Sequence, residues 1–166
     1  DGQTIAFELG GCMKRYNVGL ARTIQLGTPS DELRRTAAAV EEGMAAVMDS
    51  LKPGAIAGDV HAAWQRVLDR YGLEKPSRIG YSIGVGYAPD WGERTLSFRP
   101  REATPVPDNA VVHVILGMWM DDWGMELSET IHVRGDGCER MCDFPQHVHV
   151  CLLYTSPSPR DTVLSR

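Results

Sequence analysis

Residues 111–133, VVHVILGMWMDDWGMELSETIHV, decide the fold class of this chain. Residues 111–120 and 125–133 are both rich in β-branched and other apolar side chains, and a short polar turn separates them. Two such runs joined so closely predict neighbouring antiparallel strands in a largely buried sheet. A sheet of this kind needs further strands and a covering layer before it is stable.

The preceding part of the chain contains candidates for the further strands and for the helices that would cover the sheet. Residues 3–26 favour a strand hairpin or meander, and 79–87 favour a short Gly-rich strand. One helix is expected to begin after Ser30, which is a good N-cap, and a second to span about 58–71. Residues 88–109 are expected to form a loop. Because strands and helices are segregated along the chain, the order predicts an α+β fold rather than a doubly wound parallel sheet.

Composition excludes several classes of protein. The chain has 166 residues, of which 43% are hydrophobic and 23% charged, so it is neither disordered nor collagen-like. Its formal net charge is −5 and it has no basic stripe, which argues against nucleic acid or an anionic membrane as the main partner. No apolar run approaches the length of a membrane span. No secretory signal is recognised, and the cysteines before residue 151 are odd in number, so we expect a reduced, cytoplasmic protein.

The last residues differ from the rest. Residues 151–166, CLLYTSPSPRDTVLSR, show no helical or strand period and carry a Ser-Pro repeat. They resemble the translation of a sequencing-library adapter. We therefore expect one domain over residues 1–150 and a non-native, disordered tail over 151–166.

Four carboxylates are candidates for chemistry. Glu8 interrupts an apolar strand just before a pair of glycines, and a buried carboxylate must be either paired or functional because its desolvation is costly. Along 125–133, Glu126 and Ser128 share one strand face and Glu129 takes the other. Ordinary exposed strand charge is the alternative reading. The fourth member of the set is Glu93.

Aromatic residues gather near loops and strand ends. Aromatic side chains gathered in this way can form the wall of a site for a small cationic or ring-shaped ligand. Packing in the core is the alternative, and it is favoured for Trp64. Residues 80–84 (GYSIG) also fit the nucleophile-elbow pattern, but the residues that follow cannot begin the helix which that motif requires. The aromatic set comprises Tyr81, Tyr87, Trp91, Trp119 and Trp123.

Three stretches resemble one family. Residues 7–27 (FELGGCMKRYNVGLARTIQLG), 78–100 (RIGYSIGVGYAPDWGERTLSFRP) and 111–133 are similar to the catalytic half of the pita-bread hydrolases. This family includes proline dipeptidases, methionine aminopeptidases and creatinase, and the similarity is strongest to its ectoine hydrolase branch. The resemblance implies a partial pita-bread fold, with a curved antiparallel sheet and helices packed on its outer face. It also implies that residues 1–150 are the C-terminal part of a catalytic domain whose full-length form is a homodimer.

The resemblance also implies where metal ligands would stand. The metallopeptidases of the family hold two metal ions with two Asp, one His and two Glu. Only the first matching position keeps an acid here, and a one-residue slip at the last position would bring in Glu129 instead. We therefore expect no metal and no other cofactor, because two hard divalent ions need several oxygen or imidazole ligands. The matching positions are Glu8, Gly19, Tyr81, Ile115 and Ser128.

These observations predict a metal-independent hydrolase of a C–N bond in a small cyclic amidine, ectoine or a close relative. An amidinium carbon is already electrophilic, so a carboxylate and a proton donor suffice. Glu8 is the expected nucleophile or base, and Glu126 would hold the amidinium N–H groups. Tyr81 or His113 would donate a proton.

The remaining candidates would bind substrate. Trp91 is expected to wall the ring, and Arg94 or Arg15 to meet a substrate carboxylate. Two alternative functions stay open: a metal-dependent Xaa-Pro dipeptidase or aminopeptidase, and an inactive binding module. Also assigned to substrate binding are Glu93, Trp119 and Glu129.

Overall fold

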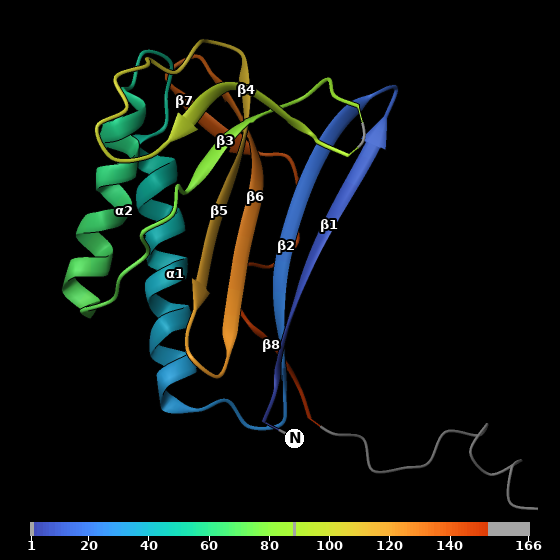
Figure 1. Ribbon diagram of the computed structural model, residues 1–166, viewed down its shortest axis with the longest axis vertical. Coiled ribbons are helices and arrows are strands. Elements are labelled where there is room, and N and C mark those ends of the chain that lie inside the picture. The colour runs from blue at the N-terminus through green and yellow to red at the C-terminus, as the bar shows by residue number, and fades with distance from the viewer. Residues whose placement is uncertain (1, 88, 153–166) are drawn as a thin grey trace, which may run out of the picture.

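The computed structural model describes residues 2–87 and 89–152 (Figure 1). One mixed sheet carries two helices, which confirms the α+β class. The strands follow the order β1-β2-β6-β5-β3-β4, while β7 pairs with β6 and β8 runs parallel to β2. In chain order the elements are β1 (Thr4–Met13), β2 (Tyr16–Leu26), α1 (Asp31–Ser50), α2 (Ala57–Tyr71), β3 (Gly80–Ile83), β4 (Gly92–Phe98), β5 (Ala110–Trp119), β6 (Gly124–Arg134), β7 (Gly137–Arg140) and β8 (His149–Cys151).

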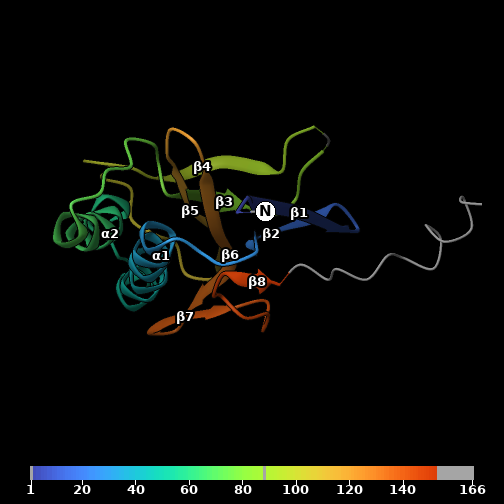
Figure 2. The same cartoon turned by 90° about the horizontal axis from the view of Figure 1, so that it is seen from below.

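Both helices lie on one side of the sheet, which we call the outer face (Figures 1 and 2). Ser30 caps α1 by accepting a hydrogen bond from the Leu33 amide, as predicted, and Gly72 ends α2 in the left-handed conformation. Trp64 of α2 is fully buried, which confirms its place in the core. The core lies between the helices and the outer face of β5 and β6. Strand residues in it include Val112, Val114, Leu116, Leu127 and Ile131.

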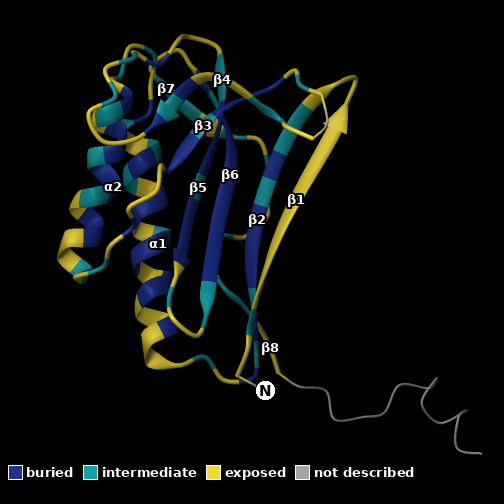
Figure 3. Cartoon of the chain, viewed as in Figure 1, coloured by how far each residue is buried: buried dark blue, intermediate teal, exposed yellow. Residues whose placement is uncertain are grey.

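The β1–β2 hairpin forms one edge of the sheet, and β4 forms the other. Its tight turn places Lys14 and Arg15 at positive φ, and the two strands then pair over their whole length. Neither α1 nor α2 covers this hairpin, and β1 is exposed along nearly its entire length (Figure 3). Its outer side carries an apolar groove of about 470 Å³ between the hairpin and the segment that holds Phe144 and His149.

The sheet curls so that its other face becomes concave (Figure 2). The segment between β3 and β4 reaches across to the tip of the hairpin. There the Asn17 amide donates to the Gly84 carbonyl (2.9 Å) and the Gly86 amide donates to the Arg15 carbonyl (3.0 Å). This contact brings β3 and β2, which are separated in the sheet by β6 and β5, together at one end of the concave face.

The structure corrects two expected boundaries. Residues 88–109 are not one loop, because residues 92–98 form β4 and pair with β3. The strand was hidden among prolines and charges, and it lies at the edge of the sheet, where it pairs with β3 alone. Cys151 was expected in the tail, but its backbone ends β8 and pairs with Leu26. Such pairing depends on backbone groups rather than on side-chain pattern. The remainder of the expected tail, 153–166, lies outside the described residues.

Candidate active site

Strand register brings the polar candidates to the concave face. Tyr81 lies opposite His113, and Ile115 lies opposite Ser128, so all four side chains share one face across β3, β5 and β6. Ser128 in turn lies opposite Ala21, which pairs with Glu8. Five strands thus contribute to one surface. The expected alternation along β6 is confirmed, because Ser128 faces this surface and Glu129 does not.

A chain of hydrogen bonds crosses the concave face. The Trp91 indole N–H donates to the Tyr81 hydroxyl oxygen at 2.8 Å. The same oxygen lies 3.2 Å from Nδ1 of His113, and Nε2 of His113 lies 2.8 Å from the Ser128 hydroxyl. The Tyr81 and Trp91 rings both meet the His113 ring edge to face, with centroids 5.5 and 6.0 Å away. We call Trp91, Tyr81, His113 and Ser128 the hydrogen-bond chain. The sequence did not indicate Ser128 as a member.

Burial sets the protonation state of this chain. His113 is fully buried, and desolvation lowers its pKa from 6.5 to about 4. Its imidazole is therefore neutral at pH 7, with one N–H and one lone pair. Burial also raises the pKa of Tyr81, an effect that the hydrogen bond from Trp91 opposes and the nearby charge of Glu8 reinforces. The hydrogen-bond chain is thus uncharged near neutral pH.

Two glycines make room for the rings. Gly10 and Gly19 pair directly across β1 and β2. A Cβ at Gly10 would lie 2.2 Å from the Trp91 ring, and one at Gly19 would lie 2.6 Å from Cε1 of His113. The space beside Gly19 is therefore filled by an imidazole. Any side chain at either position would displace an aromatic ring of the site.

Glu126 is the second acid of the concave face. It is 7% exposed, and burial together with the nearby charge of Glu8 raises its pKa to about 7, against the opposing charge of Lys75. At neutral pH it can therefore gain or lose a proton. Glu8 itself is exposed on the edge strand rather than buried, so its place beside the other acid, not its burial, marks it as a candidate.

Lys75 is a residue that sequence analysis missed. It is 9% exposed, its ammonium donates to the Ser77 hydroxyl at 2.7 Å, and burial lowers its pKa while the charge of Glu126 opposes that effect. It belongs to the segment between α2 and β3, which runs beside β5 where the Ile115 amide donates to the Ile79 carbonyl. A single lysine in an irregular segment carries no signal in sequence.

Glu129 lies outside this cluster. Its Oε1 accepts hydrogen bonds from Arg22 (2.6 Å), Gln146 (2.9 Å) and Arg140 (3.2 Å), and its side chain is fully buried. The same Arg22 also donates to the carbonyls of Pro145 and Phe144, and so fastens the segment before β8 to the sheet. The structure therefore gives Glu129 an architectural place rather than the expected position against substrate.

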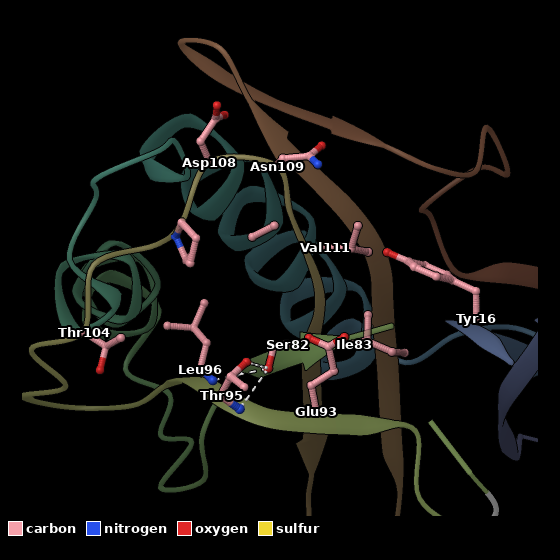
Figure 4. A pocket seen from close by; sticks show the side chains of 12 residues that line it. Tyr16, Ser82, Ile83, Glu93, Thr95, Leu96, Thr104, Asp108, Asn109 and Val111 are labelled. Carbon is pink, nitrogen blue, oxygen red and sulfur yellow. Dashed lines mark hydrogen bonds between the residues drawn. The ribbon is translucent and has the colours of Figure 1, made fainter. Parts of the chain in front are cut away.

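Three other residues that were expected to contact substrate also lie away from the hydrogen-bond chain. Glu93 lines a separate pocket of about 280 Å³ with Ser82 and Thr95, shown in Figure 4. Arg94 is exposed and paired with Asp90. Trp119 is 65% exposed at the far end of β5, six residues or about 20 Å along the strand from His113. None of the three reaches the hydrogen-bond chain.

The matched relatives agree with this architecture. Residues 1–135 match the model of metallopeptidase family M24. The chain belongs to this family. Ectoine hydrolase of Halomonas elongata is 38% identical over 151 residues, which are 90% of this chain and 38% of that protein. A Xaa-Pro dipeptidase of Pyrococcus horikoshii is 22% identical, over 84% of this chain and 39% of its own length.

Solved peptidase structures share this fold. Dipeptidase PepE from Mycobacterium ulcerans superposes with a TM-score of 0.84 at 22% identity, over 92% of this chain and 41% of that one. The X-Pro aminopeptidase from Thermotoga maritima gives a TM-score of 0.81 at 21% identity, over 90% and 42%. The pita-bread resemblance is thereby confirmed, as a partial domain. The chain spans about two fifths of the length of these relatives.

The positions that the resemblance matches to metal ligands do not fit a pair of metal ions. Gly19 and Ile115 offer no side-chain donor atom, and Tyr81 and Ser128 are both engaged with His113. Within residues 2–87 and 89–152, no group of three or more His, Cys, Asp or Glu is arranged to hold a metal. The same described residues hold no helix long and apolar enough to cross a bilayer.

Proposed function

We propose that this M24 chain serves a metal-independent hydrolase that opens a small cyclic amidine, ectoine or a close relative. One observation carries the proposal. Two carboxylates, Glu8 and Glu126, lie close enough that the charge of one raises the pKa of the other, at the place where the family's metal ligands are missing. The 38% identity to an ectoine hydrolase supports the choice of substrate.

The geometry suits attack on an amidinium carbon. Glu8 stands on the exposed edge strand, where a carboxylate can attack that carbon or take a proton from water. Glu126 would hold the amidinium N–H groups, and a bound cation would lower its raised pKa, so that binding releases a proton near neutral pH. Trp91 would wall the ring, since its own ring packs onto Gly10, two residues along β1 from Glu8.

A second candidate rests on a different similarity. The dipeptidases of Pyrococcus and the structural neighbours point to metal-dependent cleavage of Xaa-Pro peptides. That reaction needs metal ligands at Gly19 and Ile115, so this chain would have to acquire donors from outside the residues described. We therefore rank it second.

The activity is proposed for a longer protein. Because the matched relatives are more than twice as long as the aligned region, we propose that the enzyme is a longer chain and that the present 166 residues alone do not turn over substrate. The family resemblance also leads us to propose that this longer chain is a homodimer.

The test uses that longer protein in both reactions. Ectoine and a Xaa-Pro dipeptide are each assayed with the protein as purified, after chelation, and with added divalent metal. Ring opening that chelation leaves unchanged supports the proposal. Stoichiometric bound metal with activity abolished by chelation would establish the peptidase alternative instead.

A further inference from the structure

The proposed substrate carries a charge that neither acid of the concave face can receive. Ectoine is a cyclic amidine with a carboxylate on its ring, so it has a cationic and an anionic end at neutral pH. Glu8 and Glu126 suit the cationic end and repel the anionic one. The carboxylate needs a cation that the acids have not already engaged.

The two arginines that were expected to meet this carboxylate have other partners. Arg94 donates to Oδ2 of Asp90 through both Nε (3.0 Å) and Nη2 (2.6 Å). Arg15, at the tip of the β1–β2 hairpin, donates to the Tyr87 hydroxyl oxygen at 2.8 Å and stacks on that ring. Among the described residues, neither guanidinium makes a hydrogen bond or a ring contact with the hydrogen-bond chain.

Arg78 is the arginine that contacts the hydrogen-bond chain. It lies in the segment between α2 and β3, two residues before Gly80 begins the strand, and its guanidinium carbon lies 4.5 Å from the centroid of the Tyr81 ring. Tyr81 is a member of the chain and lies opposite His113 on the concave face. Stacking on this ring therefore holds a positive charge beside the candidate site.

The guanidinium of Arg78 is free to take a ligand. The residue is exposed, and within residues 2–87 and 89–152 its guanidinium forms no hydrogen bond or salt bridge. The Gly92 amide and Arg94 donate to the Asp90 carboxylate and lower its pKa, and the charge of Arg78 adds to that effect without a bond to it. The planar fork of an arginine matches both oxygens of a carboxylate.

Tyr81 lies within electrostatic range of both kinds of charge. Burial raises its pKa and the hydrogen bond from Trp91 lowers it, while the charge of Glu8 raises it further and the charge of Arg78 opposes that rise. A small zwitterion beside this ring can therefore meet an acid with one end and Arg78 with the other.

Lys75, the other cation near the concave face, suits the carboxylate less well. It is 9% exposed, its ammonium donates to the Ser77 hydroxyl, and its charge acts on Glu126. A substrate carboxylate at Lys75 would lie beside the acids that repel it.

We propose that Arg78 binds the carboxylate of the substrate and thereby selects cyclic amidines that carry one. The amidinium end then lies against Glu8 and Glu126, and the ring lies beside Tyr81. This inference rests on the proposed function. It assigns the carboxylate to a residue that sequence analysis did not single out.

Two substrates isolate this contact in the longer protein. One is ectoine, and the other is its decarboxylated analogue, which keeps the methylated cyclic amidine. In the wild-type protein, kcat/KM should be roughly 10- to 100-fold higher for ectoine, the range expected for a hydrogen bond between charged groups. R78M keeps an apolar stem against Tyr81 but removes the charge, so it should lose this preference, chiefly through a higher KM for ectoine. Its kcat/KM for the analogue should stay within about threefold of wild type.

Further variants separate charge, shape and position. R78K keeps the charge but not the planar fork, so it should keep part of the preference. R66M, at an exposed position of α2, is the matched control and should leave both substrates unaffected. R94M and R15M should keep the preference for ectoine. Thermal melting of each variant shows that it is folded.

The outcomes are distinguishable. Equal losses with both substrates in R78M would make Arg78 a support for Tyr81 alone and would overturn the proposal. A wild-type protein without the preference would overturn it too, as would a preference lost in R94M or R15M and kept in R78M. If the wild-type protein does not hydrolyse ectoine, the proposed function fails.

Binding decides the role of Arg78 wherever turnover of either molecule is undetectable. Calorimetric titration of the longer protein with the same two molecules should then show tighter binding of ectoine in wild type and no such difference in R78M. Absence of binding, or a difference that survives in R78M, would overturn the proposal.

Discussion

Glu126 and Glu129 stand three residues apart on one strand, and the fold treats them in opposite ways. Both side chains are buried. Glu129, on the side of the sheet where Arg22 lies, receives two guanidinium groups and an amide on one oxygen. For Glu126, on the concave side, burial raises the pKa to about 7; the like charge of Glu8 adds to that rise and the charge of Lys75 opposes it.

The different neighbours of Glu126 and Glu129 distinguish a structural carboxylate from one that can take part in proton transfer. A buried carboxylate that meets cations can fasten segments together: Glu129 pairs with Arg22, which also holds the segment before β8. A buried carboxylate that meets another acid is left with a proton it can exchange near neutral pH. Sequence type and burial are the same in the two cases, so the neighbours alone decide the role.

The largest effect is expected from breaking the ion pairs. E129Q keeps the size of the side chain but leaves Arg22 buried without a countercharge, so the free energy of unfolding should fall by about 3–5 kcal/mol. Urea unfolding of the chain at pH 7 measures it. A loss below about 1 kcal/mol would mean that the network contributes no more than a surface pair.

The same substitution at Glu126, E126Q, should raise the free energy of unfolding rather than lower it. Because the folded pKa of Glu126 lies above its ordinary value of 4.5, the folded state holds the proton more tightly. Its contribution to stability is full below pH 4.5 and is lost as pH rises through about 7. E126Q does not titrate, so it should become more stable than wild type by about 3 kcal/mol at pH 8 and show no gain at pH 4.5. His113, whose shift has the opposite direction, is present in both proteins and cancels in the difference. Urea unfolding across this pH range is the measurement, and a pH-independent difference would contradict it.

Glu8 should affect rate rather than stability. In the longer protein, E8Q removes charge and basicity while keeping shape, so kcat with ectoine should fall by at least roughly 10²-fold with a smaller change in KM. The same variant should lower the pKa of Glu126, because a like charge is removed. Loss of thermal stability with kcat within a few-fold would make Glu8 structural and move the nucleophile or base to Glu126.

Lys75 gives the smallest expected effect. K75M keeps the length of the stem but removes the charge that holds the pKa of Glu126 down, so that pKa should rise above about 7. Carboxyl ¹³C shifts of Glu126 followed from pH 5 to 9 measure the change, with K52M, on the exposed turn after α1, as control. An unchanged midpoint would show that Lys75 does not act on the site.

Part of the site could be predicted from the sequence alone. Strict alternation along β6 separates Ser128 from Glu129 whatever the rest of the protein does. The family resemblance pointed to Glu8 and Tyr81, and the structure brings both to the concave face beside His113. Glu93, Arg94 and Trp119 were grouped with them by residue type and proximity in sequence, and the fold separates all three.

What the sequence determined by itself is local. The caps at Ser30 and Gly72, the core position of Trp64 and the alternating faces of β6 follow from neighbours within a few residues. Tertiary structure alone decided which distant groups meet. Arg22 reaches Glu129 across 107 residues, and the Ser128 hydroxyl meets an imidazole on another strand. Those partners set charge and proton position because electrostatic energy depends on distance in space and on local dielectric, neither of which is written in the order of residues.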